Sequence, residues 1–264
     1  MIPTPLDHLL AFLLVGFIPL WGLWDKKRLL AGLRLGSGDA RVRAYLRIIL
    51  VSWALTLAML ALWFSSGRGI YALGLAFEPN LRALIGAAFA VIASGLLVLQ
   101  MVMVQKSPEK LDQVLGQLES VESVLPHNAR ELRTFGWVSI TAGICEELLY
   151  RGYLIAYFAT FANVWLAMLI AAVAFGVAHA YQGPIGILKT GAVGLIMGTL
   201  YLVSGSIWGP MLVHAVVDIT SGRIAHCALH RKAVAEFEAA KIEREQAQRE
   251  AISGGEAGNV PDLS

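Results

Sequence analysis

Long uncharged runs mark the first part of the chain. Residues 8–24 carry no formal charge and are almost wholly apolar, and further uncharged runs cover residues 48–67 and 83–105. A helix needs about 20 predominantly apolar residues to cross the hydrocarbon core of a bilayer. Each of these runs therefore predicts one membrane-spanning helix.

The stretch 134–222 is also apolar, but it carries ionisable residues inside its hydrophobic segments. No acid or base lies between Arg151 and Lys189, and residues 190–217 are uncharged again. We predict four further spans here, which gives about seven in an all-α, multi-pass transmembrane helical bundle. The composition agrees, because only 15% of the residues are charged, against about 25% in a soluble domain.

More polar segments divide the chain into four parts. We predict three N-terminal spans in residues 1–105, a cytoplasmic surface helix in 106–133, a four-span core in 134–222 and a cytoplasmic tail in 223–264. Apolar residues recur at helical spacing in the second part, which we expect to end at Pro126. In the tail, residues 230–252 predict an exposed helix and residues 253–264 a disordered end.

Basic residues are distributed unevenly between the spans. The segments 25–47, 106–133 and 223–264 carry seven, four and six Lys or Arg residues, whereas 68–82 carries two. Cytoplasmic loops are enriched in Lys and Arg, so we expect the N-terminus outside and the tail in the cytoplasm. We expect an integral protein of a bacterial plasma membrane, in contact with lipid and without a nucleic-acid partner. The oligomeric state stays open.

Six ionisable residues of the core are not expected in an ordinary membrane-spanning helix. Such residues are costly within a bilayer, face the bundle interior and usually mark function. Three lie close together, near the middle of the first core span, and the others lie on two later apolar segments. The set is Glu146, Glu147, Arg151, His179, His214 and Asp218.

Helical spacing indicates how these residues pair. Arg151 follows Glu147 by four residues and shares its helix face, so this pair neutralises one carboxylate and leaves Glu146 free. A free carboxylate in an apolar, partly wet cavity can act as a general base or acid. Asp218 follows His214 by four residues, and its carboxylate can orient the imidazole.

Three ordered motifs in the core resemble the CPBP family, which holds type II CAAX prenyl endopeptidases and Abi bacteriocin-immunity proteins. The motifs are Glu-Glu-x-x-x-Arg at 146–151, Phe-x-x-x-His at 175–179 and His-x-x-x-Asp at 214–218. The last motif often ends in Asn in that family, whereas this chain has Asp218. The resemblance covers about 134–222 and includes neither the N-terminal spans nor the tail.

The resemblance implies an intramembrane endopeptidase that cleaves a peptide or protein tail. Glu146 would activate water with the help of His179. His214 and Asp218 would bind the substrate carbonyl, or orient the group that does. Glu147 and Arg151 would hold the helices in place. The substrate would enter from the membrane or from the cytoplasmic side.

Metal dependence stays open at this point. Members of the family are called metalloproteases, yet a metal-free glutamate mechanism is also proposed for them. The chain lacks His-Glu-x-x-His, but two histidines and a carboxylate can bind zinc, and the candidates are His179, His214 and Glu146. The reading without bound metal is slightly favoured.

Two other classes of function fit the same apolar bundle. The chain could be a non-catalytic immunity or scaffold protein that keeps the family fold. It could also be a proton-coupled transporter that uses buried Glu and His as a relay. A transporter would show broken helices in paired halves, and the chain has no such internal symmetry. The intact motifs favour the endopeptidase.

Overall fold

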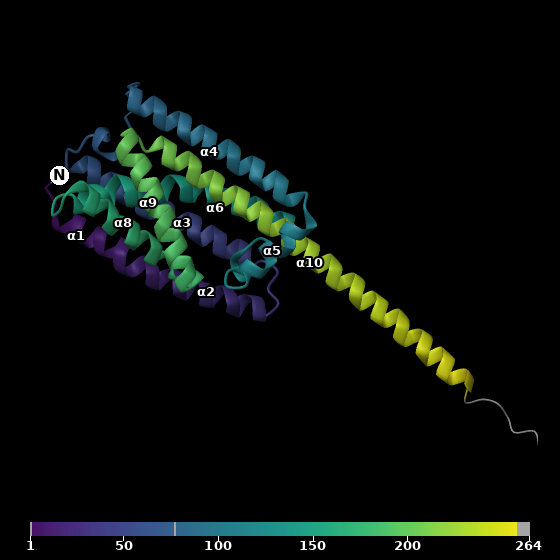
Figure 1. Ribbon diagram of the computed structural model, residues 1–264. Coiled ribbons are helices and arrows are strands. Elements are labelled where there is room, and N and C mark those ends of the chain that lie inside the picture. The colour runs from purple at the N-terminus through teal and green to yellow at the C-terminus, as the bar shows by residue number, and fades with distance from the viewer. Residues whose placement is uncertain (1, 77, 258–264) are drawn as a thin grey trace, which may run out of the picture.

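The computed structural model describes residues 2–76 and 78–257, with side chains up to residue 248. The described residues form helices and connecting turns and contain no strand. The long helices lie side by side in one bundle, from which the C-terminal helix projects (Figure 1). The predicted all-α fold is therefore confirmed.

Four helical stretches are long and apolar enough to cross a membrane. They are Pro5–Arg34, Ala40–Ser65, Leu81–Gln105 and Pro184–Ser204. The first three contain the uncharged runs 8–24 and 83–105 and all but the last two residues of the run 48–67. The first stretch joins α1 (Pro5–Phe12), η1 (Leu13–Phe17) and α2 (Ile18–Arg34), and the other three are α3, α4 and α9.

Three further helical rods complete the bundle. One joins α6 (Ala129–Glu146), η4 (Glu147–Leu154) and α7 (Ile155–Phe158); the second is α8 (Val164–Ala178); the third is the first part of α10 (Trp208–Ala257). The predicted core therefore consists of these three rods and α9. α8 is apolar but has only 15 residues, and the number of true membrane crossings remains a prediction.

The segment after α4 is shorter as a helix than its apolar spacing predicts. α5 (Pro108–Leu118) begins with a Ser107 cap and ends well before Pro126, and a short 3-10 turn, η3 (Glu122–Val124), follows it. The carbonyls of Ser120, Ser123 and Val124 accept hydrogen bonds from side chains of α2 and α3. These bonds satisfy carbonyls that a longer helix would pair with its own amides.

The tail is one continuous extension of the last core helix. α10 runs unbroken to Ala257, and residues 231–248 are exposed along it. Figure 1 shows this part projecting well beyond the bundle. The helix continues past Ser253, where the sequence predicts disorder, and residues 258–264 of that prediction lie outside the described residues.

A buried ion pair fastens the N-terminal helix to the bundle. Asp7 is fully buried; its carboxylate caps α1 through the backbone N–H of Thr4 and accepts two hydrogen bonds from Arg68, at 2.7 and 2.6 Å. The Tyr153 hydroxyl donates to the backbone carbonyl of Asp7 at 2.9 Å. Hydrogen bonding to Asp7 raises the pKa of Arg68, which lies in the loop after α3. η4 is thereby tied to α1.

The substitution Asp7→Asn tests the contribution of this pair. Removing one partner of a buried ion pair typically costs about 3–5 kcal/mol, and we expect a loss of that size in the free energy of unfolding in detergent. The matched control is Asp39→Asn, which breaks the exposed Asp39–Arg130 pair and should cost less than about 1 kcal/mol. Equal losses in the two variants would contradict this account.

Candidate active site

The six predicted residues meet at one place in the bundle, although they come from three separate rods. Glu146 is the last residue of α6, and Glu147 and Arg151 lie in η4. His179 directly follows α8, and the remaining two lie on α10. η4 is a π-helical segment, and such segments are frequent at functional sites. The set consists of Glu146, Glu147, Arg151, His179, His214 and Asp218.

The carboxylate of Glu147 is the centre of the cluster. Its Oε1 lies 2.8 Å from Arg151 Nη1 and 2.6 Å from His214 Nδ1. Glu147 has no exposed surface and Arg151 has 2%, so the two charges compensate each other away from solvent. The predicted Glu147–Arg151 pair is confirmed. The bond to His214 joins η4 to α10 and was not predicted.

Glu147 lies closer to the ring of His214 than Asp218 does, although the sequence assigns the orienting role to Asp218. The Nε2 atom of His214 lies 3.7 Å from Asp218 Oδ2, which exceeds the usual hydrogen-bond range of about 2.7–3.2 Å. Asp218 is thus within ion-pair distance of His214, as the spacing predicts, but the ring makes its short hydrogen bond to Glu147, and the orienting role of Asp218 stays a prediction. Helical spacing identifies neighbours that are four residues apart, whereas His214 and Glu147 are 67 residues apart in the chain.

Phe175, the first residue of the second motif, packs against three members of the cluster. The guanidinium of Arg151 lies 4.2 Å from the centroid of the Phe175 ring, a cation–π arrangement. The same ring lies 4.8 Å from the ring of His179 and 5.9 Å, edge-on, from that of His214. The aromatic position of the motif thus holds the Arg and both imidazoles in place.

The hydrogen bonds of the two imidazoles fix which nitrogen carries a proton. His179 Nδ1 lies 2.9 Å from the carbonyl oxygen of Phe175, and His214 Nδ1 faces the Glu147 carboxylate. Both partners only accept hydrogen bonds, so Nδ1 is the protonated nitrogen in each ring. In the neutral imidazole, each Nε2 is then an acceptor. The two Nε2 atoms lie 3.9 and 3.8 Å from Glu146 Oε2.

Glu146 differs from its neighbour in that its carboxylate makes ion-pair contacts at 3.8 and 3.9 Å but no hydrogen bond as short as those of Glu147 Oε1. Its Oε2 atom has no hydrogen bond within the described part of the chain. The side chain is 21% exposed, and that of His179 is 17% exposed, so both reach open space. A separation of 3.9 Å is too long for a direct bond, but one water can bridge polar groups at such distances. The arrangement suits a carboxylate that handles water.

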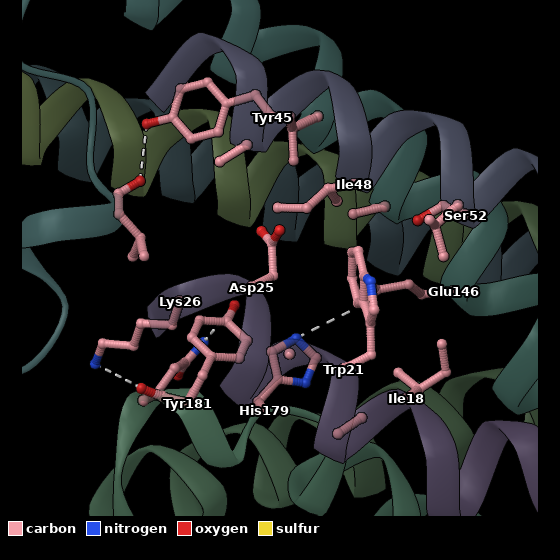
Figure 2. A pocket seen from close by; sticks show the side chains of 18 of the residues that line it. Ile18, Trp21, Asp25, Lys26, Tyr45, Ile48, Ser52, Glu146, His179 and Tyr181 are labelled. Atoms are coloured by element: carbon pink, nitrogen blue, oxygen red, sulfur yellow. Dashed lines mark hydrogen bonds and ion pairs between the residues drawn. The ribbon is translucent and has the colours of Figure 1, made fainter. Parts of the chain in front are cut away.

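The open space is a cavity of about 330 Å³. Glu146, His179 and Asp218 lie on its wall, and most of the other lining residues are apolar and come from α2, α3 and α6. Figure 2 shows His179 and Glu146 facing the cavity beside Trp21 and Ile48. The sequence gives no role to the N-terminal helices; in the structure they form a large part of this wall.

The metal candidates do not form a metal site. Over the residues that the structure describes, no group of three or more His, Cys, Asp or Glu side chains is placed to hold a metal ion. The classification as a metalloprotease therefore has no support from this geometry, and we derive no step through a metal.

Comparison with known proteins agrees with the motifs. Residues 128–220 match the family model described as type II CAAX prenyl endopeptidase, Rce1-like. The match supports a CPBP-family protease over this segment. No curated protein and no solved structure matches the chain. The Rce1-like segment contains all six residues of the cluster, whereas α1 to α5 and most of the projecting tail lie outside it.

The two adjacent glutamates should differ in their effect on stability. Glu147→Gln leaves Arg151 without its counter-charge and gives His214 only a neutral amide oxygen as acceptor, and we expect a loss of about 3–5 kcal/mol in the free energy of unfolding. Glu146→Gln breaks no direct hydrogen bond and should change that free energy by less than about 1 kcal/mol. Thermal unfolding of the two purified variants in detergent measures the difference. Equal stability would refute the central place given to Glu147.

Proposed function

We propose that the chain is an intramembrane endopeptidase in which Glu146 activates the water that attacks a peptide bond. The Rce1-like segment supports a CAAX-type intramembrane protease in general. The observation that carries the finer proposal is the contrast between two neighbouring carboxylates. Glu147 is fully buried and hydrogen-bonded to Arg151 and His214, whereas Glu146 Oε2 has no hydrogen bond within the described residues and its side chain lines the cavity.

The proposed reaction begins with a water held between Glu146 and His179. Glu146 takes one proton from this water while the oxygen attacks the carbonyl carbon of the substrate, which gives a tetrahedral intermediate. Glu146 then passes the proton to the leaving nitrogen as the C–N bond breaks. A correctly placed general base of this kind typically contributes about 10²–10⁴-fold to the rate.

The developing oxyanion needs a hydrogen-bond donor on the opposite side of the carbonyl carbon. We assign this role to His214, which can donate from Nε2 in its protonated form because Nδ1 is already bonded to Glu147. Asp218 lies 3.7 Å from the same Nε2. At that distance its negative charge stabilises the protonated ring without taking the Nε2 proton from the oxyanion. Asp218 accepts hydrogen bonds but does not donate them as the Asn of the family motif does.

The cavity suits a substrate with an apolar segment next to the cleaved bond. Most of its lining residues are apolar, and the polar ones away from the catalytic end include Asp25, Lys26 and Tyr45. We propose that a peptide or protein tail reaches the cavity from the membrane or from the cytoplasmic side. The surroundings are lipid on the flanks of the bundle, in a bacterial plasma membrane.

Cleavage by purified protein tests the proposed function. The wild-type chain, in detergent or lipid vesicles, should cut membrane peptides into two fragments that mass spectrometry identifies. Glu146→Gln should reduce the rate at least about 100-fold while the protein remains folded. The control is Glu109→Gln on the exposed face of α5, which should cleave normally. Normal cleavage by Glu146→Gln would refute the mechanism, and no cleavage by folded wild type would favour the non-catalytic alternative.

The proposed orientation gives a separate prediction. Cysteines introduced at the exposed positions Gln246 and Tyr71 should respond oppositely to an impermeant thiol reagent in intact cells, in a background that lacks Cys145 and Cys227. We expect labelling of Tyr71→Cys, in the loop after α3, and none of Gln246→Cys until the cells are opened. Ready labelling of Gln246→Cys in intact cells would reverse the orientation.

A further inference from the structure

α2 touches the turn that carries His179, although α2 lies outside the Rce1-like segment. The turn comprises His179 and the 3-10 element η5 (Ala180–Gln182). Gly22 lies against it: a Cβ there would meet Tyr181 Cδ1 at 3.4 Å and the Ala178 carbonyl at 3.6 Å. One helical turn further on, Lys26 donates a hydrogen bond to the Tyr181 carbonyl at 2.7 Å. Gly22 and Lys26 thus contact the turn from the same face of α2.

The turn needs such a partner because it is no longer part of a helix. α8 ends at Ala178, and the last carbonyls of a helix lack partners within it. Among the backbone bonds of the turn, Gln182 donates to His179 and Gly183 donates to Ala180, at 2.9 and 3.0 Å. The Tyr181 carbonyl accepts its hydrogen bond from the ammonium of Lys26. A charge-assisted bond of this kind is roughly twice as strong as a neutral one.

The same ammonium also binds a second segment of the cavity wall. Lys26 Nζ lies 3.0 Å from the carbonyl of Ser120, in the segment 119–125 that follows α5. Two donors of α3 hold the same segment: Arg41 bonds the Ser123 carbonyl at 3.0 Å and Tyr45 bonds the Val124 carbonyl at 2.8 Å. Val121, Val124 and Leu125 line the cavity. Lys26 is therefore the side chain that joins this segment to the His179 turn, as Figure 2 shows for its bond to Tyr181.

We propose that Lys26 is a positioning residue for His179. It touches no reacting atom; it holds the backbone of the turn 180–182, and through it keeps His179 Nε2 opposite Glu146. Within the described part of the chain, the hydrogen bond of the ring goes to its own helix, through the Phe175 carbonyl, and its contact with Glu146 of α6 is longer, at 3.9 Å. Its place relative to α6 therefore depends on where the turn is held. The inference rests on the proposed function and implies that the N-terminal helices complete the active site of the Rce1-like segment.

Lys26→Met tests this role, with Lys27→Met as the matched control. Lys27 is adjacent on α2 and exposed, so its loss should leave cleavage unchanged. For Lys26→Met we expect kcat per folded molecule to fall about tenfold or more, with KM changed less than about twofold, because substrate still meets the same apolar wall. Lys26→Arg keeps the charge and the donors and should recover most of the rate.

Hydrogen exchange measures how firmly Lys26 holds the turn, without relying on catalysis. In Lys26→Met, the amides of Gln182 and Gly183 should exchange about tenfold faster than in wild type, whereas Lys27→Met should leave them unchanged. Unchanged exchange in Lys26→Met would overturn the inference, and so would faster exchange with an unaltered kcat. Failure of the wild-type chain to cleave would instead overturn the proposed function and, with it, the catalytic part of the inference. The exchange rates would still show whether Lys26 holds the turn.

Discussion

A carboxylate with no exposed surface must have its charge compensated within the protein, since burying an isolated ion is very costly. Glu147 meets this constraint with two partners, Arg151 on its own helix and His214 on α10. Arg151 is in turn covered by the ring of Phe175 from α8. The requirement to satisfy one buried charge thus fixes three rods relative to one another.

This arrangement also leaves the neighbouring carboxylate free for chemistry. Arg151 and the protonated nitrogen of His214 are both committed to Glu147, so neither competes for Glu146. The Nε2 atoms of His179 and His214 then face Glu146 Oε2 from two sides. The change from α-helix to π-helix occurs between the two glutamates, at the point where one side chain turns to the core and the other to the cavity.

Local spacing in the sequence predicts those parts of the structure that depend on one helix or on apolar composition. The uncharged runs locate the N-terminal helices, the i,i+4 rule finds Glu147–Arg151, and the motifs collect all six residues of the site. The same rule assigns His214 to Asp218, because it cannot detect Glu147 on another rod. The segment after α5 is held by distant donors such as Lys26, which lies 94 residues from Ser120 in the chain. The Asp7–Arg68 ion pair likewise joins residues that are 61 apart. Such contacts follow from the packing of the helices and not from sequence spacing.

An experimental structure of the Glu146→Gln variant with a bound peptide substrate tests the central claim most directly. The account predicts that the peptide lies in the cavity between α2, α3 and α6. The carbonyl carbon of the bond to be cleaved should lie beside residue 146 and His179, and its oxygen should point to His214. The Glu147 carboxylate should still bridge Arg151 and His214. A peptide bound elsewhere, or a Glu147 that contacts the substrate while Arg151 pairs with another residue, would contradict it.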